Sequence, residues 1–185
     1  MPELTRWFKN RRKRTVKPVC LVVHAMGEHI KADGIIPAWD WLEQSGLSVH
    51  ALIYPNGTVL RSAHDEDVAY HAGKSRIVIG DKTWEGLNAV SLGAEFLLAG
   101  DYDYTSLLKG MAQPDAYSDA QYEAGAKLYA GWCRDFALPV ERVVGHSDVS
   151  GDELRGEGNG KRDPGQGWNM ARFRNLVRAQ LAPTA

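Results

Sequence analysis

The chain has 185 residues, of which 44% are hydrophobic and 24% are charged, with 22 basic and 23 acidic side chains. This balance is typical of one globular domain and excludes a disordered or fibrous protein, and no apolar run approaches the roughly 18 residues of a membrane span. Cys20 and Cys133 allow one disulfide at most. A chain of this length needs no such crosslink, so both are expected to be buried free thiols.

Positive charge is concentrated at the N-terminus. Residues 1–17 hold seven of the 22 basic side chains and one of the 23 acidic ones. We expect a basic N-terminal arm over residues 1–17, weakly attached and able to contact an anionic envelope, followed by the main domain over 18–185. A short helix leaning on the acidic body is the alternative. No apolar stretch follows the basic run, so the sequence predicts no signal peptide and synthesis in the cytoplasm.

The N-terminal half contains signals for one buried strand, a helix and a two-stranded hairpin. Residues 19–23 are an apolar run, ending at His24, that is typical of a buried strand. Residues 35–44 have helical spacing. Residues 48–54 and 58–61 flank an Asn-Gly pair, which between β-rich runs predicts a hairpin.

The C-terminal half also contains signals for strands alternating with helices. Residues 90–96 and 140–144 are predicted strands, and residues 168–181 form the closing helix. A further helix is expected over 118–136, because it begins at a serine suited to capping. The stretch 97–117 is long for a connection, and we expect either the wall of a cleft or a plain surface loop.

This alternation predicts an α/β fold: one domain with a central mixed β-sheet flanked by α-helices. No repeat, low-complexity stretch or linker indicates a second domain. We expect a monomer without specific nucleic-acid binding.

Three polar residues stand where predicted strands and loops end. His24 ends the first strand, His146 follows the last one, and Asp163 precedes the closing helix. Loops at strand ends converge above a sheet, so these side chains can meet. Two imidazoles and a carboxylate leave zinc a fourth, open position, as catalytic zinc requires. Taken singly, each residue has a plainer interpretation: hydrogen-bonded structural histidines and an aspartate in a Pro-Gly turn.

The order of short motifs along the chain resembles the zinc-dependent N-acetylmuramoyl-L-alanine amidase family. That family includes cytoplasmic wall-recycling amidases, phage endolysins and peptidoglycan recognition proteins. The resemblance covers roughly residues 18–180 and is carried by His24 and by segments 69–75, 91–95, 145–148 and 161–165.

The resemblance implies that Zn²⁺ is the cofactor, with the three polar residues above as its ligands. It also implies Glu95 as the catalytic acid and base and Lys161 as the cation that stabilises the oxyanion. Other branches of the family place a tyrosine where this chain has Val49, so this chain must rely on Glu95. A satisfied strand-end carboxylate and a solvated loop lysine are the alternatives.

The remaining histidines are weaker candidates for a role in the site. The resemblance implies that His71 lines the substrate cleft, with a packing role as the alternative. His50 is expected on the sheet near the metal, either behind the metal ligands or in the substrate-binding cleft. His29 is a possible rival ligand, but it lacks the His-Glu-x-x-His spacing that places two ligands on one helical face. His64 is expected at the surface.

The implied function is hydrolysis of peptidoglycan by zinc-activated water, between N-acetylmuramic acid and the L-alanine of its stem peptide. The substrate is then peptidoglycan or a muropeptide, and we expect a phage-type endolysin that acts on the wall after release. A cytoplasmic enzyme that recycles anhydromuropeptides is the alternative. A non-catalytic peptidoglycan-binding module is another, but such modules typically lack a metal ligand. No ligand spacing indicates a zinc peptidase of another fold.

Overall fold

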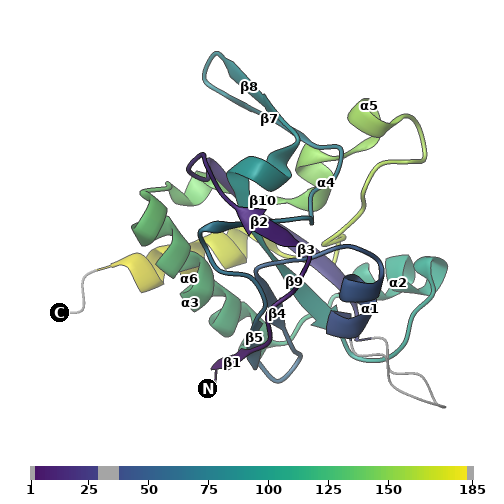
Figure 1. Cartoon of the computed structure of the whole chain (residues 1–185). Coiled ribbons are helices and arrows are strands. Elements are labelled where there is room, and N and C mark those ends of the chain that lie inside the picture. Colours follow the sequence, from purple (N-terminus) through teal and green to yellow (C-terminus); the bar gives the residue numbers. More distant parts are fainter. Residues whose placement is uncertain (1–2, 29–37, 183–185) are drawn as a thin grey trace.

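The computed structural model describes residues 3–28 and 38–182. Within them a six-stranded sheet forms the centre of the molecule, in the order β1-β5-β4-β9-β3-β10 (Figure 1). β4, β9, β3 and β10 are parallel, whereas β5 pairs antiparallel with β4, so the expected mixed sheet and its hairpin are confirmed. The strands are β1 (Glu3–Thr5), β3 (Cys20–Gly27), β4 (Ala51–Ile53), β5 (Val59–Arg61), β9 (Ser91–Leu98) and β10 (Val143–Gly145).

Helices cover both faces of this sheet, which confirms the expected α/β class (Figure 1). The long helices α3 (Asp119–Phe136) and α6 (Met170–Leu181) pack on one face, and α1 (Ala38–Gln44) packs on the other. The shorter helical elements are α2 (Tyr104–Met111), α4 (His146–Val149), α5 (Asp152–Arg155) and the 3-10 turns η1 (Leu87–Val90) and η2 (Val140–Arg142).

Side chains alternate between the two faces along the central strands. Val23 and Ala25 of β3 and Ala94 of β9 belong to the core beneath α3 and α6. Successive residues of a strand point to opposite faces, so the intervening His24 and Glu95 point away from those helices. The large apolar core therefore lies on one side of the sheet, and the polar side chains of interest lie on the other.

Two helices, α3 and α1, follow their sequence signals closely. α3 begins at Ser118, whose hydroxyl accepts from the Gln121 amide in a reciprocal capping box, as expected from a good N-cap. α1 begins at Ala38 among the described residues, and residues 35–37 of the predicted helix lie outside them. The buried Gln121 side chain also donates to the carbonyls of Ile53 and Leu97, at 3.1 and 2.9 Å, and so ties α3 to β4 and β9.

Three other segments differ from their predictions. Residues 97–117 are not one loop, because Asp103 caps the N-terminus of α2 by accepting from the Ser106 amide at 2.7 Å. The predicted strand over 140–144 begins as the 3-10 turn η2, and β10 starts only at Val143. The hairpin of β7 (Arg76–Ile79) and β8 (Lys82–Glu85) was not predicted, and its turn uses the left-handed conformation of Gly80.

The N-terminal segment is part of the fold. β1 pairs with β5, and β2 (Arg11–Lys13) pairs antiparallel with β6 (Asp67–Ala69). Between the two strands the Phe8 side chain is 1% exposed and stacks on Trp39, with ring centroids 4.7 Å apart. The expected weak attachment is therefore wrong for residues 3–14, because a few apolar contacts and backbone pairing on two strands outweigh the repulsion among the basic side chains.

Several of the basic side chains are engaged within the molecule. Arg11 and Lys13 form ion pairs with the buried Asp67 carboxylate, and Arg6 pairs with Asp40 at 2.5 Å. The half-buried Arg14 guanidinium donates to the backbone carbonyls of Ala89, Asp67 and Ser91 at 2.7–2.8 Å. Burial lowers the pKa of Arg14 to about 10, so it stays charged at neutral pH. Contact between an anionic envelope and the exposed Lys9, Arg12 and Lys17 stays a prediction.

Both cysteines are buried free thiols, as expected. Among residues 3–28 and 38–182, no helix combines the length and apolar character that crossing a membrane requires.

Replacing Phe8 with alanine should lower the free energy of unfolding by about 3 kcal/mol, because it removes a buried aromatic ring and leaves a cavity against Trp39. Urea unfolding followed by fluorescence and circular dichroism measures this change. The neighbouring Trp7→Ala is the matched control: Trp7 is 39% exposed, so its loss should cost less than about 1 kcal/mol. Equal, small effects of both substitutions would show that the N-terminal segment is not docked.

Candidate metal centre

A row of three polar residues crosses the sheet on the face away from α3 and α6. His24 of β3 is opposite Glu95 of β9 in the parallel register. Gly145, the last residue of β10, is opposite Val23, so His146 follows next to His24. Parallel pairing thus brings together side chains that are far apart in the sequence.

The candidate metal cluster consists of His24, His146 and Asp163. One potential ligand atom of each lies within 4.8 Å of the other two. The Nδ1 atoms of His24 and His146 lie 3.3 and 3.0 Å from Asp163 Oδ2. The structure therefore brings together all three residues that the sequence indicated as ligands.

Each histidine has a partner behind it on its other ring nitrogen. His146 Nε2 lies 3.3 Å from the carbonyl oxygen of Ala72, and His24 Nε2 lies 2.8 Å from His71 Nδ1. A carbonyl oxygen can only accept, so a neutral His146 that donates from Nε2 to Ala72 presents its Nδ1 lone pair to the cluster. This arrangement is common among metal-binding histidines.

The loop that carries Asp163 is held from three sides. The Ser147 amide at the start of α4 donates to the Asp163 carbonyl at 2.9 Å, and the Lys161 amide donates to the Ser150 carbonyl at 2.9 Å. The buried Tyr117 hydroxyl donates to the Pro164 carbonyl at 2.6 Å. These bonds position the carboxylate and Lys161 beside the strand ends.

Burial and mutual interaction set the charges of the cluster. Burial, reinforced by the neighbouring His146, lowers the pKa of His24 to about 4, so its ring is neutral at physiological pH. Burial alone would raise the pKa of Asp163, but the two histidines outweigh it and hold that pKa well below the usual range. The cluster therefore presents a neutral His24 imidazole and an ionised carboxylate, which are the protonation states that metal ligands need.

Glu95 lies beside the cluster, and one of its carboxyl oxygens is buried. Its Oε2 atom is buried and has no hydrogen-bond partner among the described residues. Burial raises the pKa of this carboxyl well above 4.5; Asp163 raises it further, whereas Lys161 lowers it. A carboxyl in such a site is suited to hold and to transfer a proton near neutral pH.

These residues line one end of a cavity of about 410 Å³. Its polar end contains the three cluster residues with Glu95, His71 and Lys161. Its other walls are largely apolar, and α2 supplies part of them. Residues 97–117 therefore form a cleft wall, one of the two forms expected for this stretch. Tyr102 and Tyr104 are the aromatic residues of this stretch in the wall, whereas the third aromatic residue, Trp41, was not predicted because no local pattern distinguishes it.

The donor set fits zinc. Zinc takes imidazole nitrogen and carboxylate oxygen at about 2 Å, and ligands at that distance around a tetrahedral ion lie about 3.3 Å from one another. The distances of 3.3 and 3.0 Å from Asp163 Oδ2 to the two Nδ1 atoms agree with this spacing. With three protein ligands, one coordination position stays open, as in catalytic rather than structural sites.

The other histidines are placed differently. His50 is fully buried, and its Nδ1 accepts from the Gly93 amide at 3.2 Å. It is not among the residues that line the cavity, and its role behind the metal ligands or toward substrate stays a prediction. His71 does line the cavity, and its role toward substrate stays a prediction. His64 is half-buried and stacks on Trp7, and His29 lies outside the described residues.

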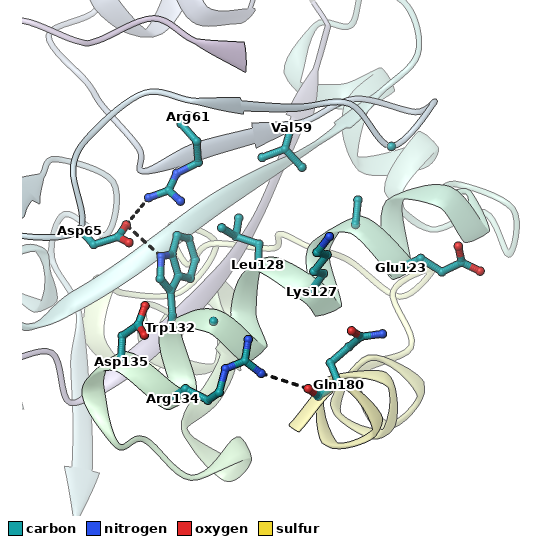
Figure 2. A pocket seen from close by; sticks show the side chains of 13 residues that line it. Val59, Arg61, Asp65, Glu123, Lys127, Leu128, Trp132, Arg134, Asp135 and Gln180 are labelled. Carbon is teal, nitrogen blue, oxygen red and sulfur yellow. Dashed lines mark hydrogen bonds and ion pairs between the residues drawn. The ribbon is translucent and has the colours of Figure 1, made fainter. Parts of the chain in front are cut away.

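Figure 2 shows a second hollow, of about 450 Å³, between β5 and α3. Some of its polar groups are engaged within the protein: Asp65 accepts from Arg61 and from Trp132 Nε1, and Arg134 donates to the Gln180 carbonyl at 3.0 Å. None of the cluster residues lines this hollow. The candidate metal ligands, Glu95 and Lys161 all line the cavity described above, on the other face of the sheet.

Comparison with known proteins identifies a family for this chain. The family model described as N-acetylmuramoyl-L-alanine amidase matches residues 14–166, which include the cluster, Glu95 and Lys161. The 1,6-anhydro-N-acetylmuramyl-L-alanine amidase AmpD of Escherichia coli is 29% identical over 131 residues, which are 71% of this chain. The match spans only 58% of that relative's length.

Solved structures of similar shape include two amidases. A crystal structure of an AmpD derivative has a TM-score of 0.66 at 24% identity, over 95% of this chain and 94% of that one. The endolysin LysCS from Clostridium intestinale has a TM-score of 0.59 at 15% identity, over 96% and 95% of the two chains. At these identities the likeness shows a shared fold.

We expect the protein to bind one equivalent of zinc. His24→Ala, His146→Ala and Asp163→Ala should each weaken zinc binding by more than about 100-fold, because two remaining protein ligands leave the coordination shell incomplete. Competition with a chromophoric chelator measures these affinities. His64→Ala, which removes a histidine away from the cluster, is the control and should bind normally. A cluster variant with unchanged affinity would remove that residue from the ligand set.

Glu95 should also make stability depend on pH in the metal-free protein. A carboxyl whose pKa is raised by folding stabilises the fold fully only below its ordinary value of 4.5, and this contribution is lost as pH rises through the folded pKa. Glu95→Gln carries no such charge, so its stability relative to wild type should increase with pH.

Urea unfolding with chelator present, at about pH 5 and pH 9, tests this difference. Glu123→Gln, on the exposed side of α3, is the matched control and should follow wild type at both values. A constant difference between Glu95→Gln and wild type would mean that Glu95 is not protonated more readily in the folded state.

Proposed function

Because the chain belongs to the N-acetylmuramoyl-L-alanine amidase family, we propose that it hydrolyses the amide bond between N-acetylmuramic acid and the L-alanine of the peptidoglycan stem peptide. One observation carries this proposal. The zinc-compatible cluster, a carboxyl with a raised pKa and a lysine line the same end of one cavity. Such a combination suits metal-assisted hydrolysis of an unreactive amide.

His24, His146 and Asp163 would hold the zinc ion. When bound, zinc supplies Lewis-acid chemistry, polarising the scissile carbonyl and making water a stronger nucleophile at neutral pH. Glu95 would take the proton from the attacking water and deliver it to the nitrogen of the leaving L-alanine. The raised pKa of Glu95 in its dry site supports the second of these transfers, because a carboxylic acid that keeps its proton is a better donor.

Lys161 would stabilise the negative charge that develops on the carbonyl oxygen. It lines the cavity two residues before Asp163, in the loop held by the Ser150 carbonyl. A donor aimed at a developing oxyanion contributes about 3 kcal/mol to the lowering of the barrier.

The apolar side of the cavity would receive the substrate. Trp41 and Tyr104 are 40% and 62% exposed, so their rings are available to a sugar or a peptide side chain. Exposed aromatic side chains of this size are expected to contribute to binding when they line a concave site. A module that only binds peptidoglycan would need these walls but neither Glu95 nor a complete ligand set.

Two biological roles are distinguished by the form of their substrate, which is either intact wall or soluble anhydromuropeptides. We propose a phage-type endolysin that acts on intact wall, in line with the sequence interpretation and the shared fold with an endolysin. The second candidate is an amidase that acts on soluble anhydromuropeptides. The Escherichia coli relative, whose name denotes a 1,6-anhydro-N-acetylmuramyl-L-alanine amidase, favours that candidate.

Purified protein loaded with zinc should release peptides with a free N-terminal L-alanine, and Glu95→Gln should lower kcat by at least about 100-fold, since an amide cannot carry the proton. Mass spectrometry of products from soluble muropeptides and from sacculi, run in parallel, measures the activity and identifies the preferred form.

Glu123→Gln is the control for this substitution and should leave kcat unchanged. Zinc affinity of Glu95→Gln should match wild type, which separates loss of the proton carrier from loss of the metal. Turnover near the wild-type rate would exclude Glu95 as the proton carrier. Zinc-loaded protein that leaves the muramoyl amide intact in both substrates would refute the proposed function.

A further inference from the structure

The segment His71–Ala72 lies behind both histidines of the cluster. The Ala72 carbonyl faces His146 Nε2 at 3.3 Å, and His71 Nδ1 faces His24 Nε2 at 2.8 Å. Two adjacent residues thus each contact one of these histidines, at the ring nitrogen that points away from the cluster. For His24 the partner is another imidazole, which can donate or accept, so this bond alone does not define where the protons lie.

Ser91, the first residue of β9, determines the direction of this bond. Its hydroxyl donates to the Leu87 carbonyl at 2.6 Å, and a carbonyl can only accept. The single hydroxyl proton is therefore used, and toward His71 Nε2, at 3.3 Å, Ser91 Oγ acts as the acceptor. His71 consequently carries its proton on Nε2 and has a lone pair on Nδ1.

The same logic continues to the cluster. His71 Nδ1 can only accept, so His24 Nε2 is the donor of their 2.8 Å bond. A neutral His24 then has its lone pair on Nδ1, the atom that lies 3.3 Å from Asp163 Oδ2. The chain of bonds from Leu87 through Ser91 and His71 thus points the lone pair of His24 at the position of the metal.

Two further features are built for this contact. A Cβ atom at Gly93 would lie 2.7 Å from His71 Nδ1 and 3.1 Å from His24 Nε2, so only glycine leaves room for the pair. The Asn88 side-chain oxygen accepts from the amides of His71 and Ala72, at 3.0 and 2.6 Å, which fixes the segment behind both ligands.

We propose that His71, oriented by Ser91, is a positioning residue that holds His24 in the tautomer and ring orientation required for zinc. This inference rests on the metal site of the proposed function. It assigns His71 a task on the protein side of the cluster, where the sequence suggested a substrate contact. Outer partners of metal-bound histidines typically contribute about 10- to 100-fold to metal affinity.

Zinc affinity of substituted proteins tests the proposal. His71→Leu keeps the bulk of the ring but cannot accept, so its zinc affinity should fall about 10- to 100-fold. His71→Asn offers an amide oxygen close to the position of Nδ1 and should restore affinity to within about fivefold of wild type. Chelator competition measures both, and thermal melts monitored by circular dichroism confirm that the variants are folded.

Ser91→Ala tests the outer end of the chain of bonds. Without Ser91 Oγ, both tautomers of His71 become accessible, and zinc affinity should fall by a smaller factor, about three- to tenfold. Ser62→Ala is the matched control, because Ser62 is also fully buried but makes no contact with His71. Its zinc affinity should equal that of wild type.

The tautomers can be observed without metal. Long-range ¹H–¹⁵N correlation spectra of the metal-free protein should show His24 and His71 protonated on Nε2, and the His24 signals should change in Ser91→Ala. A wild-type His24 protonated mainly on Nδ1, toward Asp163, would overturn the proposal. This measurement serves even if His71→Leu fails to fold.

The outcomes separate this inference from the proposed function. If wild-type protein binds zinc and folded His71→Leu binds it equally well, the positioning role is refuted and the metal site stands. If wild-type protein binds no zinc, the proposed function fails, and the tautomer spectra alone decide whether His71 orients His24.

Discussion

The parallel pairing of β3 with its neighbours β9 and β10 is the constraint on which the rest of the structure depends. It places Glu95 opposite His24 and brings His146 next to the same row. A shift of one residue in either pairing would turn the moved side chain toward α3 and α6, because strand residues alternate between faces. The large apolar core beneath those helices opposes such a shift, so the packing of one face fixes the chemistry of the other.

Polar side chains in this dry region are satisfied mainly by one another. The Asp163 carboxylate lies against two imidazoles, and each imidazole has an outer partner in the segment His71–Ala72. Burial keeps the imidazole of His24 neutral, while the histidines keep the carboxylate ionised. The same burial that is costly for isolated charges therefore prepares a site for a cation.

Hydrogen bonds connect the N-terminal segment to the part of the sheet that lies behind the candidate metal cluster. Arg14 donates to the Ser91 carbonyl and to the Asp67 carbonyl, and its Nη2 lies 3.4 Å from His50 Nε2. The fully buried His50 in turn accepts from Gly93, directly beneath the contact of His24 with His71. The predicted basic arm is thus in large part a structural element of the fold. The positively charged Arg14 helps to order the region behind the cluster.

Local signals in the sequence were sufficient for the main strands and for α3 with its Ser118 cap. The three candidate ligands and Glu95 were instead indicated by a family resemblance that spans the chain. Apolar runs and helix capping each act within a few residues, so they can be read along the chain. The docking of Phe8, the burial of His50 and the orientation of His71 by Ser91 were decided only by the tertiary structure. Each depends on contacts between residues 20 to 47 positions apart or on the space left by a neighbouring strand, and no local pattern encodes these.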